Sequence, residues 1–65
     1  MAEMNREEKI ELVVRLQTAV AALSLAGRTA SEYGADAATI AHIETAVRDL
    51  AGVRNRLEAQ LLKGC

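Results

Sequence analysis

Apolar residues recur at alternating intervals of three and four along two stretches of this chain. The first stretch repeats Val13, Leu16, Val20, Leu23, Gly27 and Ala30, and the second repeats Ile40, Ile43, Val47, Leu50, Arg54, Leu57 and Leu61. This spacing is the a/d rhythm of a heptad and is typical of helices that pack side by side. The pattern predicts two helices, over about 6–33 and about 37–63, in one domain that spans residues 1–65.

Helix start and stop signals flank both stretches. Asn5, with Glu8 three residues later, forms the pattern of a capping box. Gly34 is the usual left-handed stop after a helix, and Asp36 is suited to cap the next one. A turn over 34–36 between two helices of equal length predicts an antiparallel hairpin.

The expected turn also fixes which residues face each other. With the centre of the turn near Ala35, Val20 faces Leu50 and Gly27 faces Ile43. Small residues then oppose large ones near the turn, as close packing requires. On the first helix, the apolar stripe is widened on one flank by Leu12, Ala19, Ala26 and Tyr33.

Composition supports a helical fold and argues against an enzyme. Hydrophobic residues make up 51% of the chain, Pro is absent, and Tyr33 is the single aromatic residue, which we expect to pack against Ala37 across the turn. A core of small aliphatic side chains in 65 residues leaves little room to enclose a substrate cleft. The sequence therefore predicts no enzymatic activity, no cofactor and no small-molecule substrate.

Charge and cysteine content narrow the partners. The net charge is −1, and acidic residues are mixed among the eight basic ones, so we expect no nucleic-acid binding. No apolar run approaches the roughly 18 residues of a membrane span, and the opening residues are unlike a signal peptide. A single cysteine, Cys65, fits a reducing compartment. These features predict a cytoplasmic protein that binds no membrane.

Candidate reactive residues lack the neighbours that their chemistry needs. His42 has no second ligand three or four residues away, so it predicts no metal site. Cys65 follows the C-terminus of a helix, whose negative end disfavours a thiolate. Carboxylates fall into solvated pairs such as Glu11 with Arg15. No catalytic, metal-binding or cofactor-binding residue is assigned.

A two-helix hairpin of this size cannot bury all of its apolar surface. Ile10 and Val14 near the start of the first helix, and Leu62 near the end of the second, add to the surplus. We therefore expect the hairpin to complete a four-helix bundle, by dimerisation or by docking on a helical partner protein. The predicted partner-binding residues are Leu12, Leu16, Val20, Leu23, Ile43, Val47, Leu50, Arg54, Leu57 and Leu61.

Arg54 is the polar residue at a central position of this stripe. One interpretation is that its stem packs against the seam while its guanidinium reaches water. The other is that it fixes the register of the helices or the choice of partner, as a single polar a-position does in coiled coils.

The turn Gly34-Ala35-Asp36-Ala37, the segment Arg15-Leu16-Gln17 and the repeats of the second helix resemble the small E-type co-chaperones of type III secretion needles. The first helix is about one turn longer than in that family, and Ile40 and Ile43 stand where aromatic residues are common in it. The resemblance implies a hairpin that pairs with a helical-repeat chaperone. Together they would keep a needle subunit soluble in the cytoplasm.

The leading hypothesis is therefore a non-enzymatic protein–protein interaction module, a small helical-hairpin chaperone or adaptor that acts through its apolar stripe. The alternative is a homodimeric four-helix-bundle regulatory protein. Nucleic-acid binding by such a dimer ranks below both, because no cluster of Lys and Arg is present.

Overall fold

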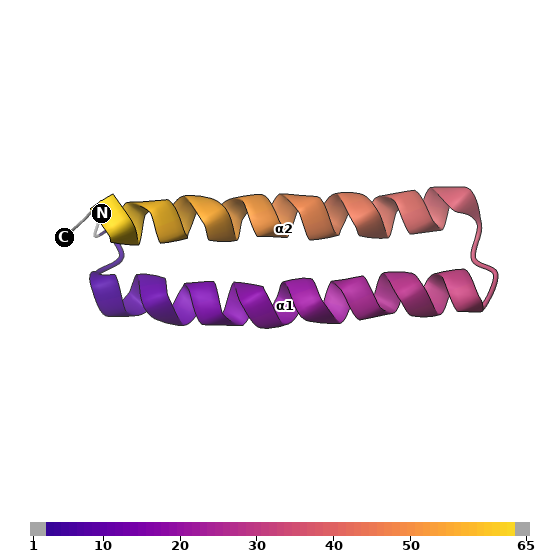
Figure 1. Cartoon of the computed structure of the whole chain (residues 1–65), viewed down its shortest axis with the longest axis horizontal. Helices are drawn as coiled ribbons and strands as arrows, with labels where there is room; N and C mark the ends of the chain where they lie inside the picture. The colour runs from indigo at the N-terminus through magenta and orange to yellow at the C-terminus, as the bar shows by residue number, and fades with distance from the viewer. Residues whose placement is uncertain (1–2, 64–65) are drawn as a thin grey trace.

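Two long α-helices make up the computed structural model, which describes residues 3–63. Helix α1 spans Arg6–Glu32 and α2 spans Ala37–Lys63, each with 27 residues. The helices lie antiparallel, so the start of α1 and the end of α2 meet at one end of the molecule (Figure 1). The predicted all-α helical hairpin is confirmed. Gly64 and Cys65 lie outside the described residues.

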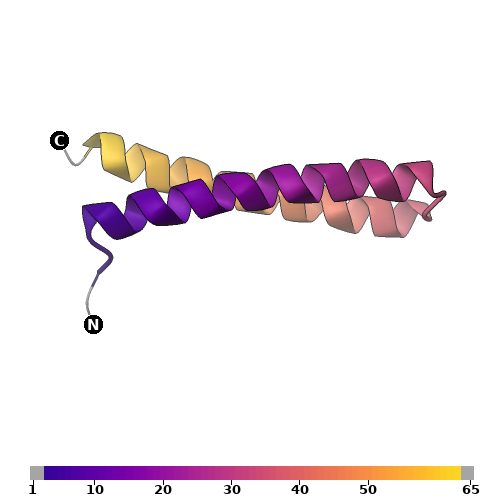
Figure 2. The ribbon, with the colours of Figure 1, turned by 90° about the horizontal axis from the view of Figure 1, so that it is seen from below.

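The hairpin is a rod rather than a sphere. Its extents are 46 × 22 × 16 Å and its radius of gyration is 14.7 Å, whereas a compact domain of this length has a radius of about 11 Å. The two helices cross at a shallow angle (Figure 2). Below, the end that carries the turn is the turn end, and the opposite end is the open end.

The start of α1 is fixed by a capping box. The Asn5 side chain accepts a hydrogen bond from the backbone N–H of Glu8 at 2.9 Å. In return, the backbone N–H of Asn5 donates to Oε1 of Glu8, also at 2.9 Å. Two backbone donors that the helix itself leaves free are thereby satisfied, as the sequence predicts.

The turn depends on the conformational freedom of glycine. Gly34 has φ +79°, a left-handed conformation that costs other residues energy. The N–H of Ala35 then reaches the carbonyl of Ala30 at 2.9 Å. Helix α1 ends at Glu32, one residue before the predicted end, because Tyr33 has left the helical conformation and caps the helix.

The expected packing of Tyr33 against Ala37 is wrong. Tyr33 is 85% exposed. The alanines of the turn are too small to cover an aromatic ring at the end of the hairpin.

Asp36 caps the start of α2, as predicted. Its Oδ1 accepts a hydrogen bond from the backbone N–H of Thr39 at 2.9 Å. Hydrogen bonds from the side chain and then the backbone of Thr39 lower the pKa of Asp36 from its ordinary value of 3.8. The ionised carboxylate therefore stabilises the folded hairpin.

Contacts between the helices confirm the predicted register. A Cβ built on Gly27 would lie 3.3 Å from Cγ2 of Ile43, and Arg54 donates across the seam to Gln17 at 3.4 Å. Yet Leu57, at 7% exposure, is the only buried residue among 3–63. One neighbouring helix covers each apolar stripe only in part.

Gly52→Ala and Gly27→Ala should differ in their effect on stability. A Cβ at position 52 meets nothing within 4 Å, so Gly52→Ala should raise the free energy of unfolding by about 1 kcal/mol through helix propensity. At position 27 the Cβ would press on Ile43, so we expect the gain to shrink or reverse. Urea unfolding followed by circular dichroism at one protein concentration measures both. Equal gains would contradict the close approach at Gly27.

The Asp36 cap should make stability depend on pH. The native pKa lies below the unfolded value near 3.8, so the contribution is complete above that value and is lost as pH falls through the native pKa. Asp36→Asn keeps a capping oxygen but does not titrate. At neutral pH, the parent chain should unfold at a higher temperature than Asp36→Asn. Below pH 3.8, this difference in Tm should shrink. A difference that stays constant with pH would exclude this role.

Candidate functional site

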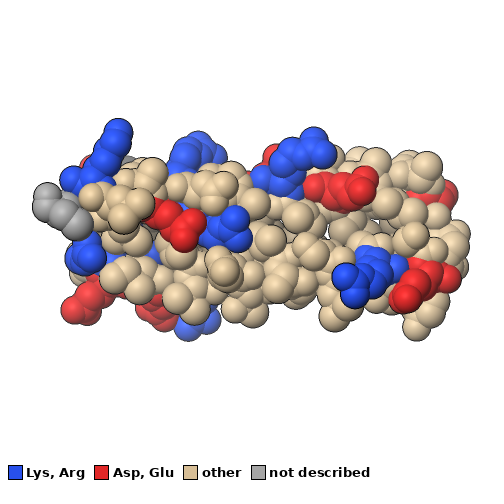
Figure 3. All heavy atoms as spheres, viewed as in Figure 1, with Lys and Arg blue, Asp and Glu red and all other residues tan. Residues whose placement is uncertain are grey.

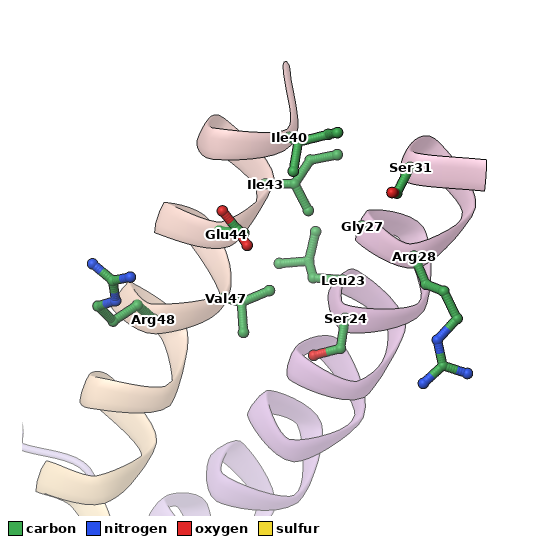
Figure 4. Close-up of a pocket in the computed structure, with 10 residues that line it drawn as sticks. All are labelled: Leu23, Ser24, Gly27, Arg28, Ser31, Ile40, Ile43, Glu44, Val47 and Arg48. Carbon is green, nitrogen blue, oxygen red and sulfur yellow. The ribbon is translucent and has the colours of Figure 1, made fainter. Parts of the chain in front are cut away.

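A groove between the helices lies near the turn end. Its volume is about 510 Å³, and it is lined by Leu23, Ser24, Gly27, Arg28, Ser31, Ile40, Ile43, Glu44, Val47 and Arg48. Figure 4 shows Leu23, Ile43 and Val47 between the helices, with Arg28 and Arg48 at the outer edges. The apolar floor of this groove comes from heptad positions, and its rim is polar and charged.

A second groove of about 270 Å³ lies at the open end. It is lined by Ile10, Val13, Val14, Glu58, Leu61 and Leu62. Three of these apolar side chains are exposed: Ile10 at 43%, Val14 at 59% and Leu62 at 78%. The surplus apolar surface that the sequence places at the open end is therefore present.

Both grooves open on the same face of the hairpin. On α1, Val14 of the open-end groove and Arg28 of the turn-end groove are fourteen residues apart, which is two heptads. On α2, Glu58 and Glu44 are likewise two heptads apart. Residues at whole-heptad spacing share one side of a packed helix. The side that carries both grooves is called the groove face below.

A polar bridge separates the two grooves. The Arg54 guanidinium donates to Oε1 of Gln17 on α1 at 3.4 Å and to Oδ1 of Asn55 at 3.2 Å. It also lies 3.7 Å from the Glu58 carboxylate, and the Arg54 side chain is only 23% exposed. The guanidinium thus has partners on both helices and does not extend freely into water.

None of the ten predicted partner-binding residues is fully exposed. Leu57 is buried, and the other nine are half-buried. Leu23, Ile43 and Val47 line the turn-end groove, and Leu61 lines the open-end groove. The remaining six, which line neither groove, are Leu12, Leu16, Val20, Leu50, Arg54 and Leu57. Most of the stripe therefore holds the two helices together, and the rest of it lines the grooves.

Sequence reasoning missed the rim of the grooves. Arg28 and Glu44 line the turn-end groove, although neither belongs to the predicted set. From the sequence, the apolar stripe of α1 is expected to be widest on the flank of Leu12. The grooves open on the opposite flank, where Ile10 and Val14 lie. The two-heptad spacing of Val14 and Arg28 was the available signal.

Charges of both signs border the turn-end groove. Toward the turn end, basic and acidic groups stand on both helices with an uncharged band between them (Figure 3).

Glu11 and Arg15 form the predicted ion pair at 3.0 Å. Residues 3–63 contain no group of three His, Cys, Asp or Glu side chains that could hold a metal ion, and His42 is exposed.

Helix α1 is long and apolar enough to cross a membrane, judged by length and composition alone. Its most apolar window of 18 residues has a mean hydropathy of 1.5. A count of consecutive apolar residues overlooks this segment, because isolated polar residues interrupt a stretch that is apolar on average. Core helices of soluble proteins and signal sequences meet the same criterion.

Comparison with protein-family models, curated proteins and solved structures found no match.

Removal of the polar bridge should allow the chain to assemble in more than one way. Arg54→Leu should keep the helices but replace one assembly mass by a mixture, because a polar heptad position excludes competing registers. Arg56→Leu, at an exposed position of the same helix, is the control. Light scattering with circular dichroism measures both variants. Unchanged mass and partner preference for Arg54→Leu would contradict a specifying role.

Proposed function

We propose that this chain is a non-enzymatic protein–protein interaction module that binds an apolar helical surface through its groove face. The concrete version is a small chaperone or adaptor. The seam residues hold the hairpin together, and the two grooves receive the side chains of the partner.

The observation that carries this proposal is the amount of exposed surface. The chain exposes 5099 Å², whereas a compact monomer of 7.0 kDa exposes about 4,000 Å². The excess of about 1,000 Å² is close to the roughly 800 Å² that each partner buries in a standard interface. One partner docked along the hairpin would therefore bring its exposure to that of an ordinary small protein.

The chemistry of the groove face favours a helical protein partner. Its floors are apolar and run along the rod, which suits side chains spaced by whole turns of a helix. Its rims carry both signs of charge, as Arg28 and Glu44 illustrate, so it lacks the basic surface that phosphate backbones require. The turn and heptads that resemble type III secretion co-chaperones suggest a helical-repeat chaperone in the cytoplasm as one candidate for this partner, and a second copy of this chain is the other.

Photocrosslinking in the native cell tests this function. With p-benzoylphenylalanine in place of Val14, which is 59% exposed on the groove face, the full chain should form a defined protein adduct. Thr18 is exposed and lines neither groove, so the same probe at Thr18 is the control. Mass spectrometry of the adduct identifies the partner.

An adduct from Val14 without one from Thr18 supports docking through the groove face. Equal labelling from both positions, or lipid adducts in place of protein, would overturn the proposal. Lipid adducts would instead place α1 in a membrane, consistent with its mean hydropathy.

A further inference from the structure

The middle of the groove face is built from two alanines. Ala21 lies one heptad after Val14 and one heptad before Arg28, so it shares their side of α1. Ala51 holds the same place on α2, one heptad from Glu44 and one from Glu58. Small side chains at the centre of a face allow another helix pair to approach closely. The two alanines therefore let a partner contact the groove face at its centre as well as at both grooves.

A partner of equal length would cover the whole face, and a second copy meets that condition. Two copies stacked face to face can be related by a two-fold axis in either of two ways. In one, the turns lie at opposite ends, and each helix packs on its own equivalent. In the other, the turns lie at the same end, and α1 of one copy packs on α2 of the other.

The arrangement with turns at opposite ends brings poorly matched side chains together. Because Glu44 and Glu58 are equally far from Ala51 along α2, each would face the other glutamate of the second copy. By the same symmetry about Ala21, Arg28 would face the apolar Val14 of the second copy and would gain no charged partner. Like charges brought together at an interface oppose association.

The arrangement with turns at the same end removes the repulsion between glutamates and gives Arg28 a charged partner. Val14 then faces Glu58 of the second copy, whose carboxylate lies 3.7 Å from Arg54 of its own chain. The hairpin register sets Arg28 of one copy against Glu44 of the other, and neither side chain has an ion-pair or hydrogen-bond partner among residues 3–63. At the open end, the exposed Ile10 meets Leu62 of the second copy. At the centre Ala21 meets Ala51.

We infer that the partner of the groove face is a second copy of this chain, and that the two hairpins form a four-helix bundle with both turns at the same end. This inference rests on the proposed function and names the occupant of the same face. The apolar floors of the grooves become the core of the bundle. The Arg54–Gln17 bridge, present twice, forms a polar layer that fixes the register.

Crosslinking between marked copies tests the inference. Full-length chains carrying Cys65→Ser and either Ala21→Cys or Ala51→Cys are mixed and treated with a short bismaleimide, and light scattering gives the mass over a tenfold range of concentration. Mixed Ala21→Cys and Ala51→Cys chains should crosslink at least about tenfold faster than a control pair, because groups held in one complex react at a raised effective concentration. Ala22→Cys mixed with Ala59→Cys, both at exposed alanines that line neither groove, is that control.

A dimer mass with rapid crosslinking only in the mixture of Ala21→Cys and Ala51→Cys supports the inference. Rapid crosslinking of Ala21→Cys chains alone would overturn it in favour of turns at opposite ends. A monomer at every concentration would overturn the second copy as the occupant. In that case a different protein captured by the Val14 probe would leave the docking function intact, whereas no adduct at all would remove the docking function as well.

Discussion

The structure depends on a geometric limit, because two helices side by side can cover only one stripe of each other. A stripe of a/d residues is wider than the line along which two cylinders touch, so part of it remains open. Leu57 is the one residue among 3–63 that is buried, and it still keeps 7% exposure. The grooves, the exposed side chains at the open end and the half-buried Arg54 all follow from that limit. The hairpin therefore leaves part of its apolar stripe open to water.

The parts of the fold that rest on local chemistry were predictable. The Asn5–Glu8 box, the left-handed Gly34 and the Asp36 cap each involve residues within three or four positions of one another. The register followed because a short turn leaves little freedom in how the helices align. Tyr33 was the exception, since whether a ring is covered depends on neighbours that local pattern does not describe.

The position of the grooves could not be derived in the same way. A heptad pattern identifies the seam, but the rotation of each helix about its own axis decides whether the flank of Leu12 or the flank of Ile10 stays open. That rotation is set by packing details such as the close approach of the Ile43 side chain to Gly27, where an added Cβ would lie 3.3 Å from Cγ2 of Ile43. Sequence reasoning therefore located the excess of apolar side chains at the open end without locating the face on which they lie.

The short turn has a consequence for how the chain folds. Residues beside Gly34 are already close in the unfolded chain, so contacts between Gly27 and Ile43 close a small loop at little entropic cost. Contact between the start of α1 and Leu57 closes a longer loop. It forms at a lower entropic cost once the contacts near the turn are in place. Folding should therefore begin at the turn and proceed toward the open end. The last segment to become ordered is then the segment with the most exposed apolar side chains, and a docked partner would arrive where the hairpin itself is least complete.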